Sequence, residues 1–302
     1  MKQADTDLLD PKNDFVFKKI FAKAPDLLCD LINAVREGHP IIEEIEILNP
    51  TIEPEELTGK HIVLDIFAQD IEGKRYNVEM QVRKYRAWNA RSTFYLARML
   101  TEQLNSGEDY LELKSAIGIH LLDFTLFDQP EHADQAVWCF EMRDRVKSHV
   151  LLGQELQLNL IELPKADRLG LAKDKLAAWI TFFEHWCEEV TMANIAYQPV
   201  QDALSKVKDL SADSETRRLA FIRERALHDE VSQLNAATEE GIAKGKSEGK
   251  AEQLLLLLSL KFEELPEWVK PKLSEATDEQ LMEWTTRFVQ TDTLEDIFES
   301  DQ

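Results

Sequence analysis

The stretch 60-KHIVLDIFAQDIEGKRYNVEMQV-82 predicts two β-strands, 60–70 and 74–82, separated by the loop 71–73. A three-residue loop with glycine in its last place suits a type I turn closed by a G1 bulge, so the two strands form a hairpin. This loop length also fixes which residues face each other, because opposed positions then have numbers that add to 144. Asp65 consequently faces Glu79, and Gln69 faces Arg75.

Two carboxylates at directly opposed positions repel each other, because their Cβ atoms lie about 4.5–5.5 Å apart on one face of the hairpin. The pair could be exposed to water that screens the repulsion, one carboxyl could be protonated, or a cation could lie between them. Asp65 interrupts the apolar run 62-IVLDIF-67, where aspartate is disfavoured in a strand. This favours a divalent cation held by Asp65 and Glu79, and oxygen ligands favour Mg²⁺, with Mn²⁺ as a second choice.

The rest of the chain predicts an α/β fold, with a mixed sheet flanked by helices and an all-helical C-terminal region. A first helix is capped by Asp10 or Asn13. Further elements follow the hydrophobic patterns: a helix at 25–35, a strand at 41–50, a helix at 86–106, and strands at 115–124, 136–144 and 155–163. We therefore expect a sheet domain over 8–165, a helical extension over 166–260 and a small acidic domain over 261–302.

Charge is distributed unevenly along the 302 residues. The net charge of −22 argues against a protein that coats nucleic acid without specificity. Residues 74–103 nevertheless carry a net +5, beside the hairpin, whereas residues 262–302 carry −9. The sequence has no apolar run long enough for a membrane span and no signal-peptide pattern at its start, so we expect a cytoplasmic protein. Three dispersed cysteines and seven unpaired histidines predict no zinc site.

The helical C-terminal half predicts assembly rather than chemistry. Gly241, Gly245 and Gly249 repeat every four residues and share one helix face, which indicates either a weakened helix or a contact between protomers. The run 254-LLLLLSL-260 requires an apolar groove, in the acidic tail or in a second protomer. We expect a homo-oligomer.

Several motifs together resemble the Rpn family of recombination-promoting, transposase-like nucleases in the PD-(D/E)xK superfamily. They are 13-NDFVFKKIF-21, 64-LDIFAQDIEGKRYNVEMQ-81, 91-RSTFYLARMLTEQLNSGEDYLELKSAIGIHLLDF-124 and 239-EEGIAKGKSEGKAE-252. The resemblance implies a restriction-endonuclease-like fold and magnesium-dependent cleavage of DNA phosphodiester bonds. A catalytically inactive DNA-binding or oligomeric adaptor on the same fold is the alternative.

Site residues carry over from this resemblance position by position. Asp65 and Glu79 become metal ligands, Gln81 occupies the place where most of the superfamily has lysine, and Asp14 matches an acidic position that assists the metal. Positive charge for the DNA phosphates is expected from the basic side chains Lys18, Arg83, Lys84, Arg91 and Arg98.

Overall fold

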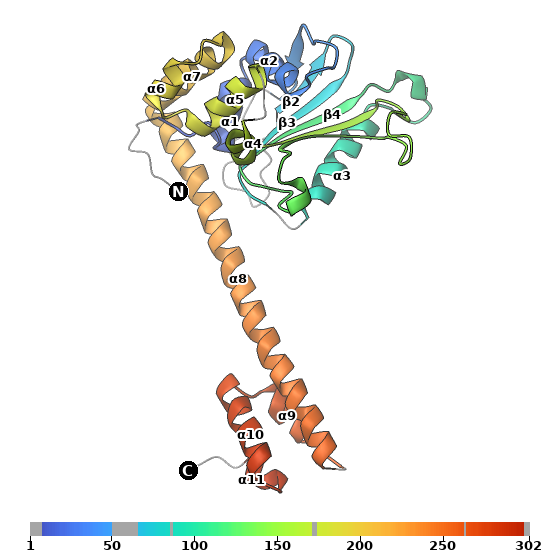
Figure 1. Cartoon of the computed structure of the whole chain (residues 1–302), viewed down its shortest axis with the longest axis vertical. Coiled ribbons are helices and arrows are strands. Elements are labelled where there is room, and N and C mark those ends of the chain that lie inside the picture. Colours follow the sequence, from blue (N-terminus) through green and yellow to red (C-terminus); the bar gives the residue numbers. More distant parts are fainter. Residues whose placement is uncertain (1–7, 50–65, 85–86, 171–173, 263, 299–302) are drawn as a thin grey trace. The chain divides into compact units, whose positions relative to one another are not determined.

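The computed structural model describes residues 8–49, 66–84, 87–170, 174–262 and 264–298. The chain divides into two compact units, 1–226 and 227–302. The first unit contains a six-stranded mixed sheet (Figure 1), and the second is helical. None of the described helices is both long and apolar enough to cross a bilayer.

The sheet has the order β1-β2-β3-β4-β6-β5. Its central strands β3, β4 and β6 run parallel to one another, and the outer strands pair antiparallel. The strands span Ile45–Ile47 (β1), Ile66–Asp70 (β2), Arg75–Gln81 (β3), Ala116–Leu122 (β4), Val137–Glu141 (β5) and Leu156–Glu162 (β6). The predicted mixed sheet is confirmed, and the strand predicted over 41–50 is shorter than expected.

The hairpin of β2 and β3 has the predicted register, with Ile66 opposite Val78 and Gln69 opposite Arg75. Its turn is closed by hydrogen bonds from Gly73 N to Asp70 O (3.0 Å) and from Asp70 N to Lys74 O (3.0 Å). Gly73 has a φ of 85°, which places it in the left-handed conformation that a G1 bulge requires.

One face of the sheet is covered by helices from both ends of the first unit. Helices α1 (Asp14–Phe21), α2 (Pro25–Val35), α5 (Asp174–His185) and α7 (Gln198–Ala212) share one apolar core with the strands. Tyr76, Val78 and Met80 of β3 supply the sheet side of this core. Asn13 caps α1, because its side chain accepts from the backbone N–H groups of Phe15 and Val16.

The opposite face is covered by α3 (Trp88–Thr101), which connects the parallel strands β3 and β4 (Figure 1). This helix buries Trp88, Ser92, Leu96 and Met99, which follow a spacing of three to four residues. Phe94 lies outside this stripe, and its side chain is 62% exposed.

The helical segment from residue 166 to about residue 226 belongs to the first unit instead of forming a separate extension. Trp179, Phe182, Val200, Val207 and Ala220 are buried in the same core as β3. Short helices α4 (Leu163–Leu169) and α6 (Glu189–Ala193) lie between the larger ones. The first compact unit consequently ends near residue 226, within helix α8 (Ser214–Lys261), and not at residue 165.

The second unit has its own small core. Leu254 and Leu258 of α8 are buried against helices α9 (Val269–Ser274), α10 (Asp278–Gln290) and α11 (Leu294–Phe298). The capping box at Thr277 begins α10. The acidic tail therefore supplies the groove that the leucine run requires, whereas Leu256 and Leu260 stay exposed.

Candidate functional site

A row of polar side chains lies on the α3 face of the central strand β3. Glu79 is only 5% exposed, and its two carboxylate oxygens each accept a hydrogen bond from a side-chain amide. Asn77 Nδ2 donates to Oε1 (2.8 Å), and Gln81 Nε2 donates to Oε2 (2.7 Å). The two amides flanking the carboxylate in the sequence therefore hold it in place, because alternate residues of a strand share one face.

His120 adds a second ionisable group beside this carboxylate. Strand β4 pairs His120 directly with Glu79, and His120 Nδ1 lies 3.5 Å from Glu79 Oε2. The ring of Trp88 packs edge-on against the imidazole, with ring centroids 5.4 Å apart. Burial lowers the pKa of His120, and the charge of Arg91 lowers it further, against the opposing effect of Glu79. The imidazole is therefore neutral at neutral pH.

Gly118 provides the space that His120 occupies. A Cβ atom at this position would lie 2.7 Å from Leu158 Cδ1 and 3.3 Å from His120 Nε2. The sequence interpretation missed His120, because its role depends on the parallel register between β3 and β4. The available signal was one histidine inside the otherwise apolar stretch 116-AIGIHLL-122.

Two buried polar atoms in this cluster have no hydrogen-bond partner in the described parts of the chain: Asn77 Oδ1 and His120 Nδ1. Buried polar atoms are almost always paired with protein, water or an ion. The carbonyl oxygen of Asn77, together with the oxygens of Glu79, makes a donor set that suits a hard cation and its bound water. The residues present therefore fit a hard divalent cation.

Asp65 and Asp14 are the two other predicted metal ligands. Asp65 lies outside the described residues, directly before Ile66, whose register with Val78 is the predicted one. Asp14 forms an ion pair with Arg223, with Arg223 Nε 2.9 Å from both carboxylate oxygens. This pair joins α1 to α8, and a metal role for Asp14 would require it to share its carboxylate with Arg223.

The predicted DNA-contacting cations also differ in exposure. Lys18 is 1% exposed, so a contact with a duplex at the protein surface does not fit its position. Arg83 is half-buried, and Lys84 is exposed, with its Nζ donating to Leu126 O (3.0 Å). Arg91 lies beside the ring of Tyr95, with 5.5 Å between the guanidinium carbon and the ring centroid.

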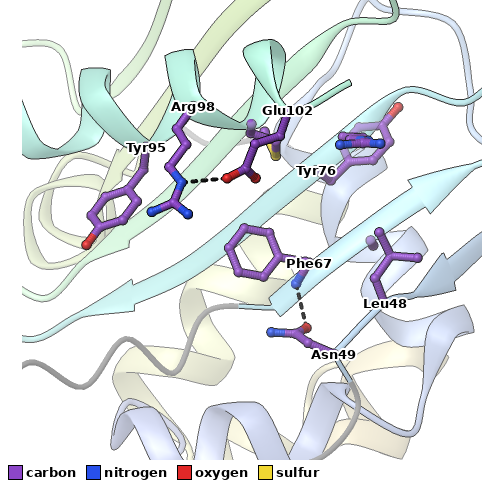
Figure 2. A pocket seen from close by; sticks show the side chains of 10 residues that line it. Leu48, Asn49, Phe67, Tyr76, Tyr95, Arg98 and Glu102 are labelled. Atoms are coloured by element: carbon purple, nitrogen blue, oxygen red, sulfur yellow. Dashed lines mark hydrogen bonds and ion pairs between the residues drawn. The ribbon is translucent and has the colours of Figure 1, made fainter. Parts of the chain in front are cut away.

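Arg98 lines a pocket between α3 and the hairpin (Figure 2). The pocket combines the aromatic side chains Phe67 and Tyr95 with the cations Arg75 and Arg98. Arg98 Nε lies 2.6 Å from Glu102 Oε1, in an exposed ion pair along the helix. Phe67 is paired with Asn77 in the hairpin, so this pocket lies on the same sheet face as Glu79.

A second buried carboxylate organises the loop after β4. Glu162 is fully buried and accepts from the backbone N–H groups of Leu126 (2.6 Å) and Phe127 (2.8 Å). Trp138 Nε1 (2.9 Å) and Lys165 Nζ (3.1 Å) complete its partners. The loop that accepts the hydrogen bond of Lys84 is therefore anchored to β6.

A mixed six-stranded sheet with flanking helices, followed by a helical C-terminal region, is consistent with a restriction-endonuclease-like fold. The family model for PD-(D/E)XK nuclease family transposases matches residues 11–237. The chain therefore belongs to the PD-(D/E)XK nuclease family transposases. Nucleases of this class generally use divalent metal ions. No curated protein and no solved structure matches the chain.

Proposed function

We propose that the protein is a metal-dependent DNA endonuclease of the recombination-promoting Rpn type. It would hydrolyse phosphodiester bonds of DNA at a site that contains Glu79. The observation that carries this proposal is the buried carboxylate of Glu79, held by two amides on the sheet face that also carries the arginines of α3. Family membership supports a nuclease or transposase-like function.

Asp65 and Glu79 would hold the metal ion, and oxygen ligands favour Mg²⁺ over softer ions. When bound, such an ion lowers the pKa of a water molecule and neutralises charge on the scissile phosphate. Asn77 and Gln81 would orient the carboxylate of Glu79 through their amide groups. Gln81 stands where most of the superfamily has lysine, so it would position a water molecule through hydrogen bonds, without adding charge.

The imidazole of His120 favours metal binding because it carries no positive charge. A protonated imidazole 3.5 Å from Glu79 would compete with a metal ion for the carboxylate. Burial and Arg91 lower the pKa of His120, so the competing charge is absent at neutral pH. We assign His120 a positioning role beside the metal ligands.

The DNA backbone would follow the arginines of α3 and the exposed Lys84. Arg91 and Arg98 lie about two turns apart on this helix and belong to the basic segment 74–103. Phosphate contacts of this kind provide affinity that falls steeply with salt. Arg83 would join them from the segment after β3, whereas the buried Lys18 is not included in this DNA path.

Gln81 also favours a second candidate function, a DNA-binding adaptor without catalysis. An amide cannot supply the positive charge that a lysine brings to the attacked phosphate. DNA binding would then persist with no cleavage.

Nicking of a supercoiled plasmid in Mg²⁺ or Mn²⁺ separates the two functions. We expect cleavage by the wild type and none by Asp65→Ala or Glu79→Gln. Glu72→Gln is the matched control, because Glu72 is an exposed carboxylate in the turn of the same hairpin. DNA binding by a wild type that never cleaves would favour the adaptor, and cleavage by both well-folded site variants would refute the proposed site.

Arg98 and Arg218 offer a matched pair for the DNA surface, since both are exposed arginines paired with a glutamate on their own helix. We expect Arg98→Gln to weaken binding and to reduce the slope of log K against log salt by about one. Arg218→Gln should leave both unchanged. Equal effects of the two substitutions would contradict a DNA path along α3.

We also propose that the protein forms a homo-oligomer through the glycine face of α8. A Cβ atom added at Gly241, Gly245 or Gly249 would meet nothing within 4 Å in the described structure, so this face has room for a partner helix. The leucine run no longer supports the argument, because Leu254 and Leu258 are covered by the tail. Light scattering on the full chain tests the proposal, and a monomer at micromolar concentration would refute it.

A further inference from the structure

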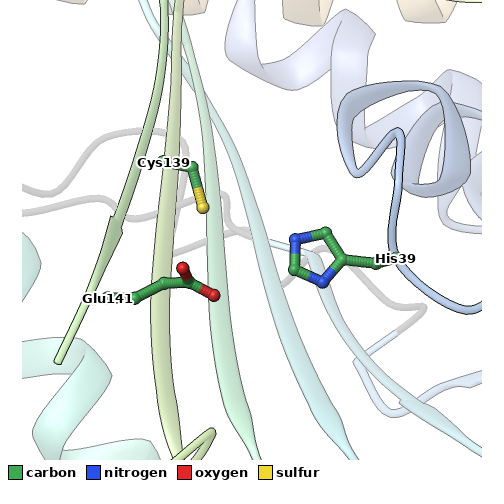
Figure 3. A group of neighbouring side chains, drawn as sticks. All are labelled: His39, Cys139 and Glu141. Carbon is green, nitrogen blue, oxygen red and sulfur yellow. The ribbon is translucent and has the colours of Figure 1, made fainter. Parts of the chain in front are cut away.

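Three potential metal ligands lie close together (Figure 3). They are His39, from the segment after α2, and Cys139 and Glu141, both from the edge strand β5. One ligand atom from each lies within 4.8 Å of the others. The three side chains come from segments about one hundred residues apart, which is why no sequence spacing indicated them.

The strand pattern of β5 places this cluster away from the Glu79 site. Trp138 packs in the cluster of Trp88 and Leu160, on the α3 face. Cys139 and Glu141 alternate with Trp138 along the strand and therefore point to the other face. The cluster takes no side chain from the proposed nuclease site, so it stands independently of the proposed function.

A buried amide connects two of the three ligands. Gln157 Nε2 lies 3.0 Å from Glu141 Oε1 and 3.2 Å from His39 Nε2. Its Oε1 accepts from Arg36 Nε (2.9 Å) and from Asn159 Nδ2 (3.3 Å), which fixes the amide. Such outer partners orient the ligands of metal sites.

The protonation states of His39 and Cys139 allow metal binding, but the Cys139 thiol has to lose its proton first. Burial lowers the pKa of His39, and the charge of Arg36 lowers it further, so its imidazole is neutral. Partial desolvation of the thiol and the charge of Glu141 raise the pKa of Cys139, so its thiol is protonated before a metal binds. Arg36 and Arg143 face the cluster and oppose a cation, whereas Glu141 and the thiolate formed on binding offset a double positive charge.

We propose that His39, Cys139 and Glu141 bind one zinc ion, with a water molecule as the fourth ligand. Nitrogen, sulfur and oxygen together are the ligand types of zinc, and a thiolate selects it over Mg²⁺. Bonds of about 2.0–2.3 Å require ligand atoms about 3.3–3.8 Å apart, so modest side-chain rotations complete the site. Binding converts the Cys139 thiol to a zinc thiolate and releases one proton to the solvent.

Titration calorimetry of the metal-stripped full chain with Zn²⁺ tests the proposal. We expect one ion per chain, with an enthalpy that varies between buffers as one released proton requires. Cys139→Ser and His39→Ala should each weaken binding about a hundredfold or more, beyond the effect typical of an outer partner. Cobalt substitution should give a thiolate charge-transfer band that only Cys139→Ser removes.

Two control variants separate this site from other zinc ligands. Cys187→Ser removes a half-buried thiol elsewhere, and Glu79→Gln removes the carboxylate of the proposed nuclease site. Both should bind zinc as the wild type does. Unchanged zinc affinity in Cys139→Ser, lost affinity in Glu79→Gln, or no binding by the wild type at micromolar zinc would each overturn the proposal. Cys139 is exposed, so its serine variant should fold normally and decide the question if His39→Ala does not fold.

Discussion

We compare the free energies of unfolding of Glu79→Ala and Glu79→Gln, both measured without metal. The comparison tests whether the hydrogen bonds from amides or the repulsion by a second carboxylate has the larger effect on stability at this position. The sequence predicts that loss of one carboxylate relieves repulsion and leaves the protein as stable or more so. The structure adds an opposing effect, because Glu79 is the acceptor for the amides of Asn77 and Gln81. Both substitutions remove the charge, so any relief of repulsion is common to the two variants.

The difference in stability between the two variants isolates the hydrogen bonds and packing. Asn77 is 4% exposed, and alanine at position 79 leaves its amide without the acceptor it has now, at about 1–3 kcal/mol. Gln81 is half-buried and can turn to water, so it adds little. Lost packing adds about 1 kcal/mol. Glu79→Gln keeps an oxygen for Asn77, so Glu79→Ala should be less stable than Glu79→Gln by about 2–4 kcal/mol.

Guanidinium denaturation in EDTA measures this difference, provided that the two variants have equal denaturant slopes. Equal stability of the two variants, within about 0.5 kcal/mol, would show that the amides do not hold residue 79, and the reasoning would be wrong. Repeating the measurement in Mg²⁺ adds a functional readout. The wild type should gain stability with increasing Mg²⁺, and neither variant should.

Three further predictions concern the surroundings of this site. Lys165→Met should destabilise the first unit by about 3–5 kcal/mol in thermal or chemical unfolding, because Glu162 then stays buried without its cation; a loss below about 1 kcal/mol would contradict this. Gly118→Ala should be destabilised by about 1–3 kcal/mol, because its Cβ would collide with Leu158, and a crystal structure should show the Leu158 side chain displaced. The pKa of His120 is lowered on folding, so its neutral form contributes stability that is present above pH 6.5 and lost as the pH falls below that value. Urea unfolding between pH 7 and 5 should therefore show a smaller loss for His120→Gln than for the wild type, and parallel profiles would refute the assignment.

Local rules were sufficient for the central hairpin. The loop length, the glycine at position 73 and the alternation of 76-YNVEMQV-82 predicted the register that the structure shows from Ile66 to Arg75. The strands β4, β5 and β6 were likewise predictable, because each is a short apolar run between turn residues. Hairpin geometry involves few residues close in sequence, so propensity and turn chemistry determine it.

Contacts between distant segments could not be predicted in this way. His120 meets Glu79 only because β4 lies parallel to β3 in one particular register. The helices after residue 165 have apolar stripes that fit many partners, and the sequence does not say that Trp179 joins the core of the sheet. The glycines of α8 lower helix propensity locally, yet the helix continues through them.

In the part of the chain that the structure describes, the α3 face of the sheet carries two buried carboxylates, Glu79 and Glu162, and their partners explain why only Glu79 is proposed to act chemically. Glu162 accepts from two backbone N–H groups, an indole and an ammonium, all of which are fixed by the fold. Glu79 accepts from two neutral side-chain amides, which can rotate to admit a cation without unfolding a turn. Both lie toward the carboxyl ends of the parallel strands β3 and β6, the edge where ligands of α/β sheets bind. Glu162 therefore stabilises the loop that holds Lys84, whereas the proposed metal ion would bind at Glu79.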